Sequence, residues 1–149
     1  MKLAVLTRFL ESYAPLNYQE DYDNAGLIVG QAEMEVTGVL VALDCTEDIV
    51  DEAMLHGFNV IVTHHPIVFK GLKKINGKSY IERVVMKAIK NDIALYAIHT
   101  NLDHVHNGVS GEICKRLGLK NPRILRPKAN LLKKLVTFCP HAQAPQLRA

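Results

Sequence analysis

Three short apolar runs, separated by segments with helical periodicity, set the strongest limit on how this chain folds. The runs span residues 39–43, 60–62 and 94–98, and their length suits buried strands. The segments between them place apolar residues on one face at helical spacing: Ile49, Val50, Ala53 and Met54 in the first, and Ile81, Val84, Val85, Ala88 and Ile89 in the second. The alternation of strand and helix is typical of parallel βαβ units. We therefore predict an α/β fold in which helices flank a small parallel sheet.

Local signals mark where the predicted helices begin. Thr46 is suited to cap the first of them, and Glu47 and Asp48 then lie favourably in its first turn. Ser79 and Glu82 have the spacing of a capping box at the start of the second. Further helices are expected over residues 2–13 and 110–117, and a short strand over residues 27–29.

Histidines and carboxylates follow the predicted strands where each strand ends. The second strand leads into His64 and His65, and the third leads into His99, with Asp103 four residues later. The first strand ends at Asp44. Ligands of open α/β sheets bind beyond the carboxyl ends of the strands, and imidazole with carboxylate suits divalent ions such as zinc, iron, manganese or cobalt. We therefore predict a divalent-metal site with His64, His65 and Asp103 as ligands.

The adjacency of His64 and His65 limits how they can share a metal site. Neighbouring residues of an extended chain point in opposite directions, so each histidine is expected to reach its own ion, with a carboxylate or water bridging the two. His99 is predicted to transfer protons, although a third imidazole ligand or a residue that supports the ligands are also open roles. His104 and His106 are expected to be exposed. The alternative for the whole set is a group of hydrogen-bonded loop histidines.

Two other polar segments have weaker functional signals. Asp23 and Asn24 predict a turn that could frame the mouth of the site. A glycine-containing loop after the histidines could attract a phosphorylated or nucleotide substrate, although a solvated loop is commoner. Its lysines are Lys70, Lys73, Lys74 and Lys78.

Composition narrows the class of protein. The chain has 149 residues, of which 48% are hydrophobic, enough for one domain with a core of its own. No apolar run approaches the roughly 20 residues that span a bilayer, and the first residues lack a cleavage site for secretion. Cys45, Cys114 and Cys139 are far apart and odd in number, which favours reduced thiols. We expect a cytoplasmic protein without a membrane partner.

Charge is distributed unevenly along the chain. Up to Cys114 there are nine basic and fifteen acidic residues, whereas from Lys115 onward there are nine basic residues and no acidic one. Such a basic segment can contact nucleic acid. We favour a second structural unit whose acidic partners lie elsewhere, so that a nucleic-acid partner is not expected.

The carboxyl-terminal residues differ from the rest in composition. Residues 120–132 contain two prolines and alternate basic with apolar residues, which predicts a linker. A new strand is expected over residues 135–138. We therefore predict a metal-binding α/β domain over 1–119, a linker over 120–132, and the start of a further, truncated domain over 133–149.

Four motifs agree in order and spacing with one known family. The segments YDNAGLIVG, VALDCTEDIVDEA, VIVTHHPIVF and HTNLDHVHNGVSGEICKRLGL resemble those of the NIF-three-like family, whose members are often labelled GTP cyclohydrolase I type 2 homologues. The resemblance covers about residues 1–119.

The resemblance implies an α/β fold, a ring-shaped homohexamer and a centre of two metal ions. It implies that His64 binds one ion, that His65 binds the other, and that Asp103 is also a ligand. In the family, a histidine and a bridging glutamate from the end of a longer chain complete the centre. The last segment of this sequence is similar to the opening of the middle domain of longer bacterial members.

Two functions from different classes follow from these observations. In the first, a metal-dependent hydrolase of the GTP cyclohydrolase type uses metal-activated water to open the imidazole ring of a purine nucleotide and release formate. Zinc, iron or manganese would be the cofactor. In the second, the protein is a metal-binding scaffold or regulator without catalytic activity, which acts through the surfaces of its oligomer.

Overall fold

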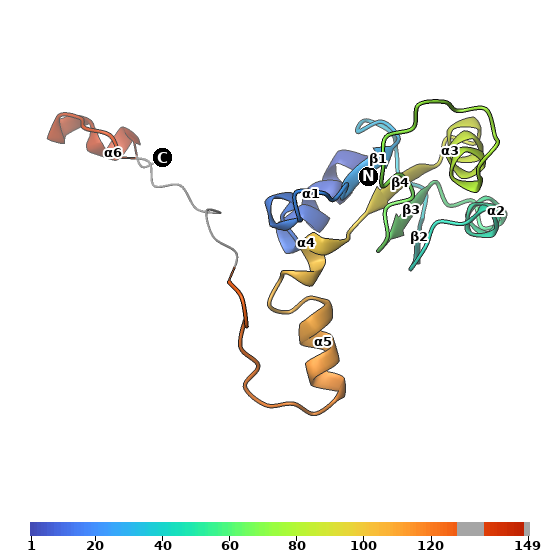
Figure 1. The fold of residues 1–149 in the computed structure, drawn as a ribbon. Coiled ribbons are helices and arrows are strands. Elements are labelled where there is room, and N and C mark those ends of the chain that lie inside the picture. The colour runs from blue at the N-terminus through green and yellow to red at the C-terminus, as the bar shows by residue number, and fades with distance from the viewer. Residues whose placement is uncertain (128–135, 148–149) are drawn as a thin grey trace.

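The structure is a computed structural model that describes residues 1–127 and 136–147. Its centre is a four-stranded sheet with helices on both faces (Figure 1). The strands follow the order β1-β4-β3-β2 across the sheet. Their bounds are Gly26–Val29 for β1, Val39–Ala42 for β2, Val60–Thr63 for β3 and Ala94–Ala97 for β4.

The three central apolar runs form the parallel part of the sheet, as predicted. β3 pairs in parallel with both β2 and β4, and Ala42, Thr63 and Ala97 lie level with one another. The residues that follow these three therefore leave the sheet at the same edge. β1 pairs antiparallel with β4, with an irregularity between Leu27 and Val29. The α/β class is confirmed, and the complete sheet is mixed because this short first strand runs the other way.

Two helices, α2 (Glu47–Leu55) and α3 (Tyr80–Lys90), cover one face of the sheet. Their apolar stripes pack against Ile61 and Leu95 of the central strands. Side chains at helical spacing supply the helical part of this core: Val50, Ala53, Val84, Val85 and Ala88. Most of the predicted apolar faces are therefore buried, but Met54 and Ile89 at the edges of these faces are exposed.

Helix α1 (Leu3–Tyr13) covers the opposite face. Leu3 is fully buried against strand residues that include Val60 and Tyr96. Residues of one strand alternate between the two faces, so Val60 meets α1 while Ile61 meets α2 and α3.

The predicted helix starts are present. The side chain of Thr46 accepts a hydrogen bond from the backbone N–H of Ile49, and that of Ser79 accepts one from the N–H of Glu82. The Glu82 carboxylate in turn accepts hydrogen bonds from the backbone N–H groups of Asn76 and Lys78 and from the Ser79 hydroxyl. The hydrogen bond from Asn76, with those from Ser79 and Lys78, lowers the pKa of Glu82.

The remaining elements are short. They are η1 (Leu16–Tyr18), α4 (Thr100–Asp103), α5 (Val109–Arg116), η2 (His141–Gln143) and α6 (Ala144–Leu147). Of the strand expected over residues 135–138, residue 135 lies outside the described residues, and residues 136–138 belong to no strand. Within the described ranges, every helix is too short or too polar to cross a bilayer.

Candidate metal centre

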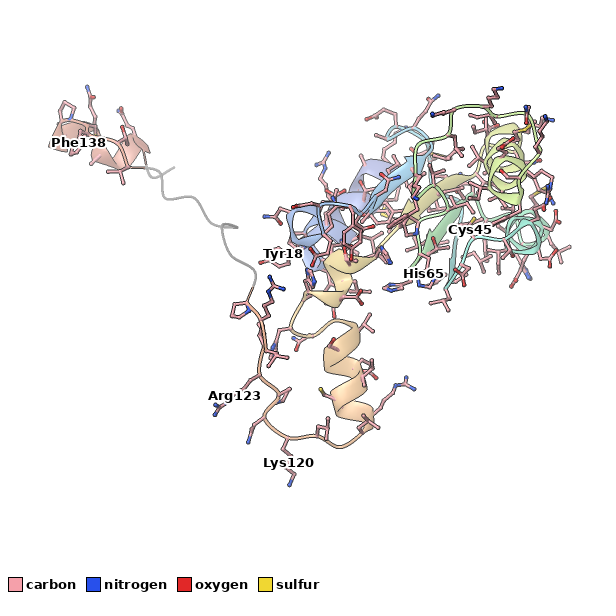
Figure 2. All side chains as sticks on the ribbon, in the orientation of Figure 1. Tyr18, Cys45, His65, Lys120, Arg123 and Phe138 are labelled. Atoms are coloured by element: carbon pink, nitrogen blue, oxygen red, sulfur yellow. The ribbon has the colours of Figure 1, made fainter. Side chains whose placement is uncertain are left out.

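The ends of β3 and β4 deliver three histidines to one edge of the sheet. His64 and His65 directly follow Thr63, and their backbone N–H groups donate to the carbonyls of Ala42 and Leu43 at 3.3 and 3.1 Å. These two hydrogen bonds to the end of β2 and the residue after it hold the backbone of both histidines. His99 lies two residues beyond the end of β4. Figure 2 shows His65 at this edge, below the ends of the central strands.

The three imidazoles form one cluster. One ring nitrogen from each of His64, His65 and His99 lies within 4.8 Å of the other two. The ring centroids are 4.9 Å apart for His64 and His65, 5.1 Å for His64 and His99, and 5.6 Å for His65 and His99. Residues 34 and 35 positions apart in the sequence thus present nitrogen atoms to one small volume.

Each ring of the cluster is oriented through its Nδ1 atom. Nδ1 lies 3.0 Å from the carbonyl oxygen of Ile98 for His64, and 2.8 Å from an oxygen of Asp44 for His65. For His99 it lies 2.8 Å from Oδ1 of Asp23. A carbonyl oxygen only accepts, so Nδ1 of His64 carries the hydrogen and Nε2 of the neutral ring keeps a free electron pair. This arrangement, in which an oxygen holds the far nitrogen of the ring, is the usual support of metal-binding histidines.

Asp23 is the most buried of these supports. Its side chain is fully buried, and it accepts hydrogen bonds from the backbone N–H and the hydroxyl of Thr100 as well as from His99. Burial alone would raise the pKa of this carboxyl. The hydrogen bonds from Thr100, His99 and the backbone of Asn24 outweigh burial, so that the pKa of Asp23 lies below its ordinary value.

Asp103 borders the cluster from α4. Its Oδ1 atom lies 3.9 Å from Nε2 of His64, which is longer than a hydrogen bond, and its side chain is about one-third exposed, at 37%. That separation is compatible with an ion bound by both groups, since ligand distances near 2.1 Å allow two donor atoms to be up to about 4.2 Å apart.

The structure changes the expected relation between His64 and His65. The two residues were expected to point in opposite directions, but their ring nitrogens lie within 4.8 Å of each other. The expectation was wrong because strand alternation ends at Thr63, and both histidines lie in the bend that follows β3. His99 completes the cluster from the turn that follows β4.

The donor set fits a divalent metal. Three imidazoles and one carboxylate are ligands that zinc, iron and manganese accept in proteins. The 4.8 Å limit on the nitrogen separations is compatible with one ion, after small side-chain shifts, or with two ions about 3.5–4 Å apart.

Sequence reasoning missed how Asp23 and Asp44 act. Asp23 was predicted to form a turn near the mouth, and Asp44 to end a strand, yet both hold cluster histidines by Nδ1. A carboxylate close to a strand end was the available signal for Asp44. No local pattern indicates that residue 23 meets residue 99.

The remaining candidates lie outside the cluster. His104 is exposed, as expected, but Nδ1 lies 2.7 Å from the carbonyl oxygen of Tyr18 and Nε2 lies 3.2 Å from Glu20. His106 is exposed. The loop lysines Lys70, Lys73, Lys74 and Lys78 are also exposed.

Sequence comparison finds relatives that match almost the whole of this chain. Relatives from Staphylococcus aureus strain MRSA252 and Staphylococcus epidermidis strain ATCC 12228, both called GTP cyclohydrolase 1 type 2 homolog, are 41% and 37% identical over 140 residues. These residues are 94% of this chain and 38% of each relative, so the chain spans well under half the length of the proteins it matches.

Solved structures of other proteins resemble this chain in both sequence and fold. A Bacillus cereus protein related to NIF3 is 40% identical, with a TM-score of 0.81 over 86% of this chain and 35% of the other. Reduced HcgD from Methanocaldococcus jannaschii is 31% identical, with a TM-score of 0.78 over 85% of this chain and 50% of the other. The model of the family described as Duf34/NIF3 (NGG1p interacting factor 3) matches residues 1–147. The chain therefore belongs to the Duf34/NIF3 family.

Proposed function

We propose that this chain binds divalent metal through His64, His65, His99 and Asp103, and that the metal serves the hydrolysis of a purine nucleotide. The observation that carries the metal site is the orientation of three neighbouring imidazoles through their Nδ1 atoms. One ring nitrogen of each histidine also lies within 4.8 Å of the other two, which supports a shared ion more than separate loop contacts.

The chain's own residues then have distinct roles. When bound, a divalent ion supplies Lewis acidity and lowers the pKa of water toward neutrality. Nε2 of His64 and Oδ1 of Asp103 are 3.9 Å apart, so these two residues are well placed to share an ion. His99, held at Nδ1 by the buried Asp23, offers Nε2 as a ligand or as the acceptor of a proton from the attacking water.

The nucleotide part of the proposal is supported by the name of the relatives, GTP cyclohydrolase 1 type 2 homolog. In the reaction we propose, water adds to the carbon between the two imidazole nitrogens of guanine, and the bond from this carbon to one nitrogen breaks. A second water then releases that carbon as formate and leaves an amine on the pyrimidine ring. We further propose that a homohexamer is the working form, as the resemblance implies.

The test measures metal content and turnover on the same preparations. Wild-type chain and the His64→Ala and His99→Ala variants are reconstituted with zinc, iron or manganese and passed through gel filtration. Bound metal is then measured by elemental analysis, and formate released from GTP is measured enzymatically. His56→Ala, at the end of α2, is the matched control.

We expect bound metal and formate release in the wild type and the control, and the loss of both in His64→Ala. Metal without turnover of any nucleotide would overturn the hydrolase and support a metal-binding scaffold. Equal metal content in the wild type and His64→Ala would overturn the metal site itself.

A further inference from the structure

Two exposed aromatic side chains lie next to the histidine cluster. Phe69 comes four residues after His65, and its ring centroid lies 6.2 Å from that of His99, with the two rings nearly perpendicular at 87°. Tyr22 precedes Asp23, the residue that holds His99, and the ring centroid of Tyr22 lies 6.1 Å from that of Phe69. The three rings are therefore in contact one after another, from Tyr22 through Phe69 to the cluster.

The backbone near both rings is held in place. Ile67 is buried and Val68 packs against the same core, so the segment that leads to Phe69 is anchored to the domain. Asn24 joins this segment to the one that carries Tyr22, because its side-chain amide donates a hydrogen bond to the carbonyl oxygen of Val68 at 2.6 Å. A ligand would meet two rings that the fold has already brought together, which lowers the entropic cost of binding.

Both rings are open to solvent, with 66% exposure for Tyr22 and 43% for Phe69. Single exposed apolar side chains are ordinary on protein surfaces. These two differ because they form the one contact between phenylalanine or tyrosine rings among the described residues, and because Phe69 also meets the cluster. An exposed pair of aromatic rings offers faces on which another flat ring can stack.

The charged neighbours of the two rings do not select for one sign of charge. Asp21 precedes Tyr22 and Lys70 follows Phe69, and both charged residues are exposed. Stacking on an aromatic side chain tolerates any base, since every base has a flat π face. A heteroaromatic ring with little net charge, such as a purine base, is therefore the class of ligand that these rings suit.

We propose that Tyr22 and Phe69 are the surface on which a purine base stacks beside the histidine cluster. The inference deepens the function proposed above and rests on it for the identity of the base. Aromatic rings in contact have centroids about 4.5–7 Å apart, so a base that packs on Phe69 is a neighbour of the ring that already touches His99. Tyr22 and Phe69 are thus positioning residues, which hold the base next to the groups proposed to activate water.

The test is the binding of guanosine to the full chain after dialysis against a chelator. The variants are Tyr22→Leu and Phe69→Leu, which keep an apolar side chain but remove the aromatic ring. Phe9→Leu is the matched control, since Phe9 is 68% exposed on α1 and contacts no other ring among the described residues. Calorimetry gives the dissociation constants of guanosine, ribose and choline.

We expect each ring variant to weaken guanosine binding about 5- to 100-fold, because the loss of one aromatic ring removes the stacking of one base. The control should leave the constant unchanged. Ribose, which has no base, should bind equally to the wild type and the variants. Unchanged thermal unfolding of the ring variants would show that they are folded.

A fluorescent variant tests the same surface without the loss of an aromatic ring. The sequence contains no tryptophan, so Phe69→Trp introduces a single one at the proposed surface and keeps an aromatic face there. Guanosine should bind this variant at least as tightly as the wild type and should quench its fluorescence. The fluorescence of Phe9→Trp should not respond to guanosine.

Several results would contradict the stacking surface. Guanosine that binds to none of these chains, or equally to the wild type and both ring variants, would overturn it. A Phe69→Trp chain whose fluorescence does not respond to guanosine would do the same. Tighter binding of choline than of guanosine would indicate a cation site on the rings instead. A changed oligomeric state of the ring variants with unchanged guanosine binding would indicate that the rings lie between subunits.

These outcomes are separate from those of the hydrolase test. Guanosine binding that needs both rings, together with no formate release from GTP, would retain the stacking surface and reject the reaction. Formate release that is unaffected in Tyr22→Leu and Phe69→Leu would retain the reaction and reject the surface.

Discussion

Asp23 is the residue that links the beginning of the chain to the histidine cluster. Its buried carboxylate contacts His99 and both polar groups of Thr100, so it fixes the turn after β4 as well as the ring of His99. A carboxylate in this position accepts every hydrogen bond directed at it. A side-chain amide of the same shape cannot, because one of its two polar atoms only donates.

We therefore expect Asp23→Asn to weaken both the fold and metal binding. Loss of charged hydrogen bonds in a buried position should lower the free energy of unfolding by about 2 kcal/mol. Misorientation of His99 should weaken metal affinity by about 10- to 100-fold. Denaturant unfolding without metal and titration with zinc would measure the two effects.

The exposed neighbour Asp21 provides the control for this variant. Asp21→Asn should leave both quantities unchanged. If Asp23→Asn bound zinc as tightly as the wild type, His99 would not be oriented by Asp23 in the manner described.

At the scale of elements, the start of α3 is held by one carboxylate. The Glu82 carboxylate accepts hydrogen bonds from the N–H groups of Asn76 and Lys78 and from the hydroxyl of Ser79. These hydrogen bonds attach the preceding loop to the first turn of the helix. These contacts favour the ionised form and lower its pKa from the ordinary value of 4.5.

The stabilisation by Glu82 should therefore depend on pH. A group whose pKa is lower in the folded state stabilises the fold above its ordinary pKa and loses this effect as pH falls through the folded-state value. Glu82→Gln should lower the unfolding temperature at pH 7, and its difference from the wild type should shrink as pH falls below about 4.5. Thermal unfolding by circular dichroism across this range is the measurement.

Glu33→Gln serves as the control, since Glu33 is exposed and lies in a different part of the chain. It should show no comparable dependence on pH. A difference between Glu82→Gln and the wild type that stays constant down to pH 3 would show that the charge of Glu82 does not matter.

The helices and strands also show which parts of the fold could be predicted from the sequence alone. Local chemistry was sufficient where one segment decides the outcome, as in the caps at Thr46 and Ser79 and the buried strands of the βαβ units. It was insufficient where distant segments meet. The antiparallel direction of β1 and the contact of Asp23 with His99 depend on pairings across about 70 residues, for which periodicity carries no signal.

The candidate site also has features that could be predicted from the sequence and features that could not. That His64, His65 and His99 lie at one edge of the sheet could be predicted, because the carboxyl ends of parallel strands lie at the same edge. The direction of each ring could not be predicted, since it is set by Ile98, Asp44 and Asp23 through hydrogen bonds that only the folded chain creates.

For the whole molecule, the predicted division near residue 119 remains to be tested. Residues 120–127 are exposed and belong to no helix or strand. Brief digestion with trypsin should therefore cut after Lys120 and Arg123 first, and should leave a resistant product that contains the sheet. Mass spectrometry would identify the fragments.

Basic residues within α3 provide the internal comparison. Arg83 and Lys87 lie in a helix and pair with Glu47 and Asp51 of α2, so cleavage there should be much slower. Equal resistance at Lys120 and Arg123 would show that this segment is part of the first domain, and the predicted boundary would be wrong.

The pairing of β1 with β4 has a consequence for how the chain folds as it is made. Both β1 and α1 find their partners late, because β1 pairs with residues up to Ala97, and Leu3 of α1 packs on Ala94 and Tyr96. At a synthesis rate of about 5–20 residues per second, the amino-terminal segment waits several seconds on the ribosome before β4 exists. During this interval β2, α2 and β3 can already assemble, so β1 is synthesised before these elements but joins the sheet after them.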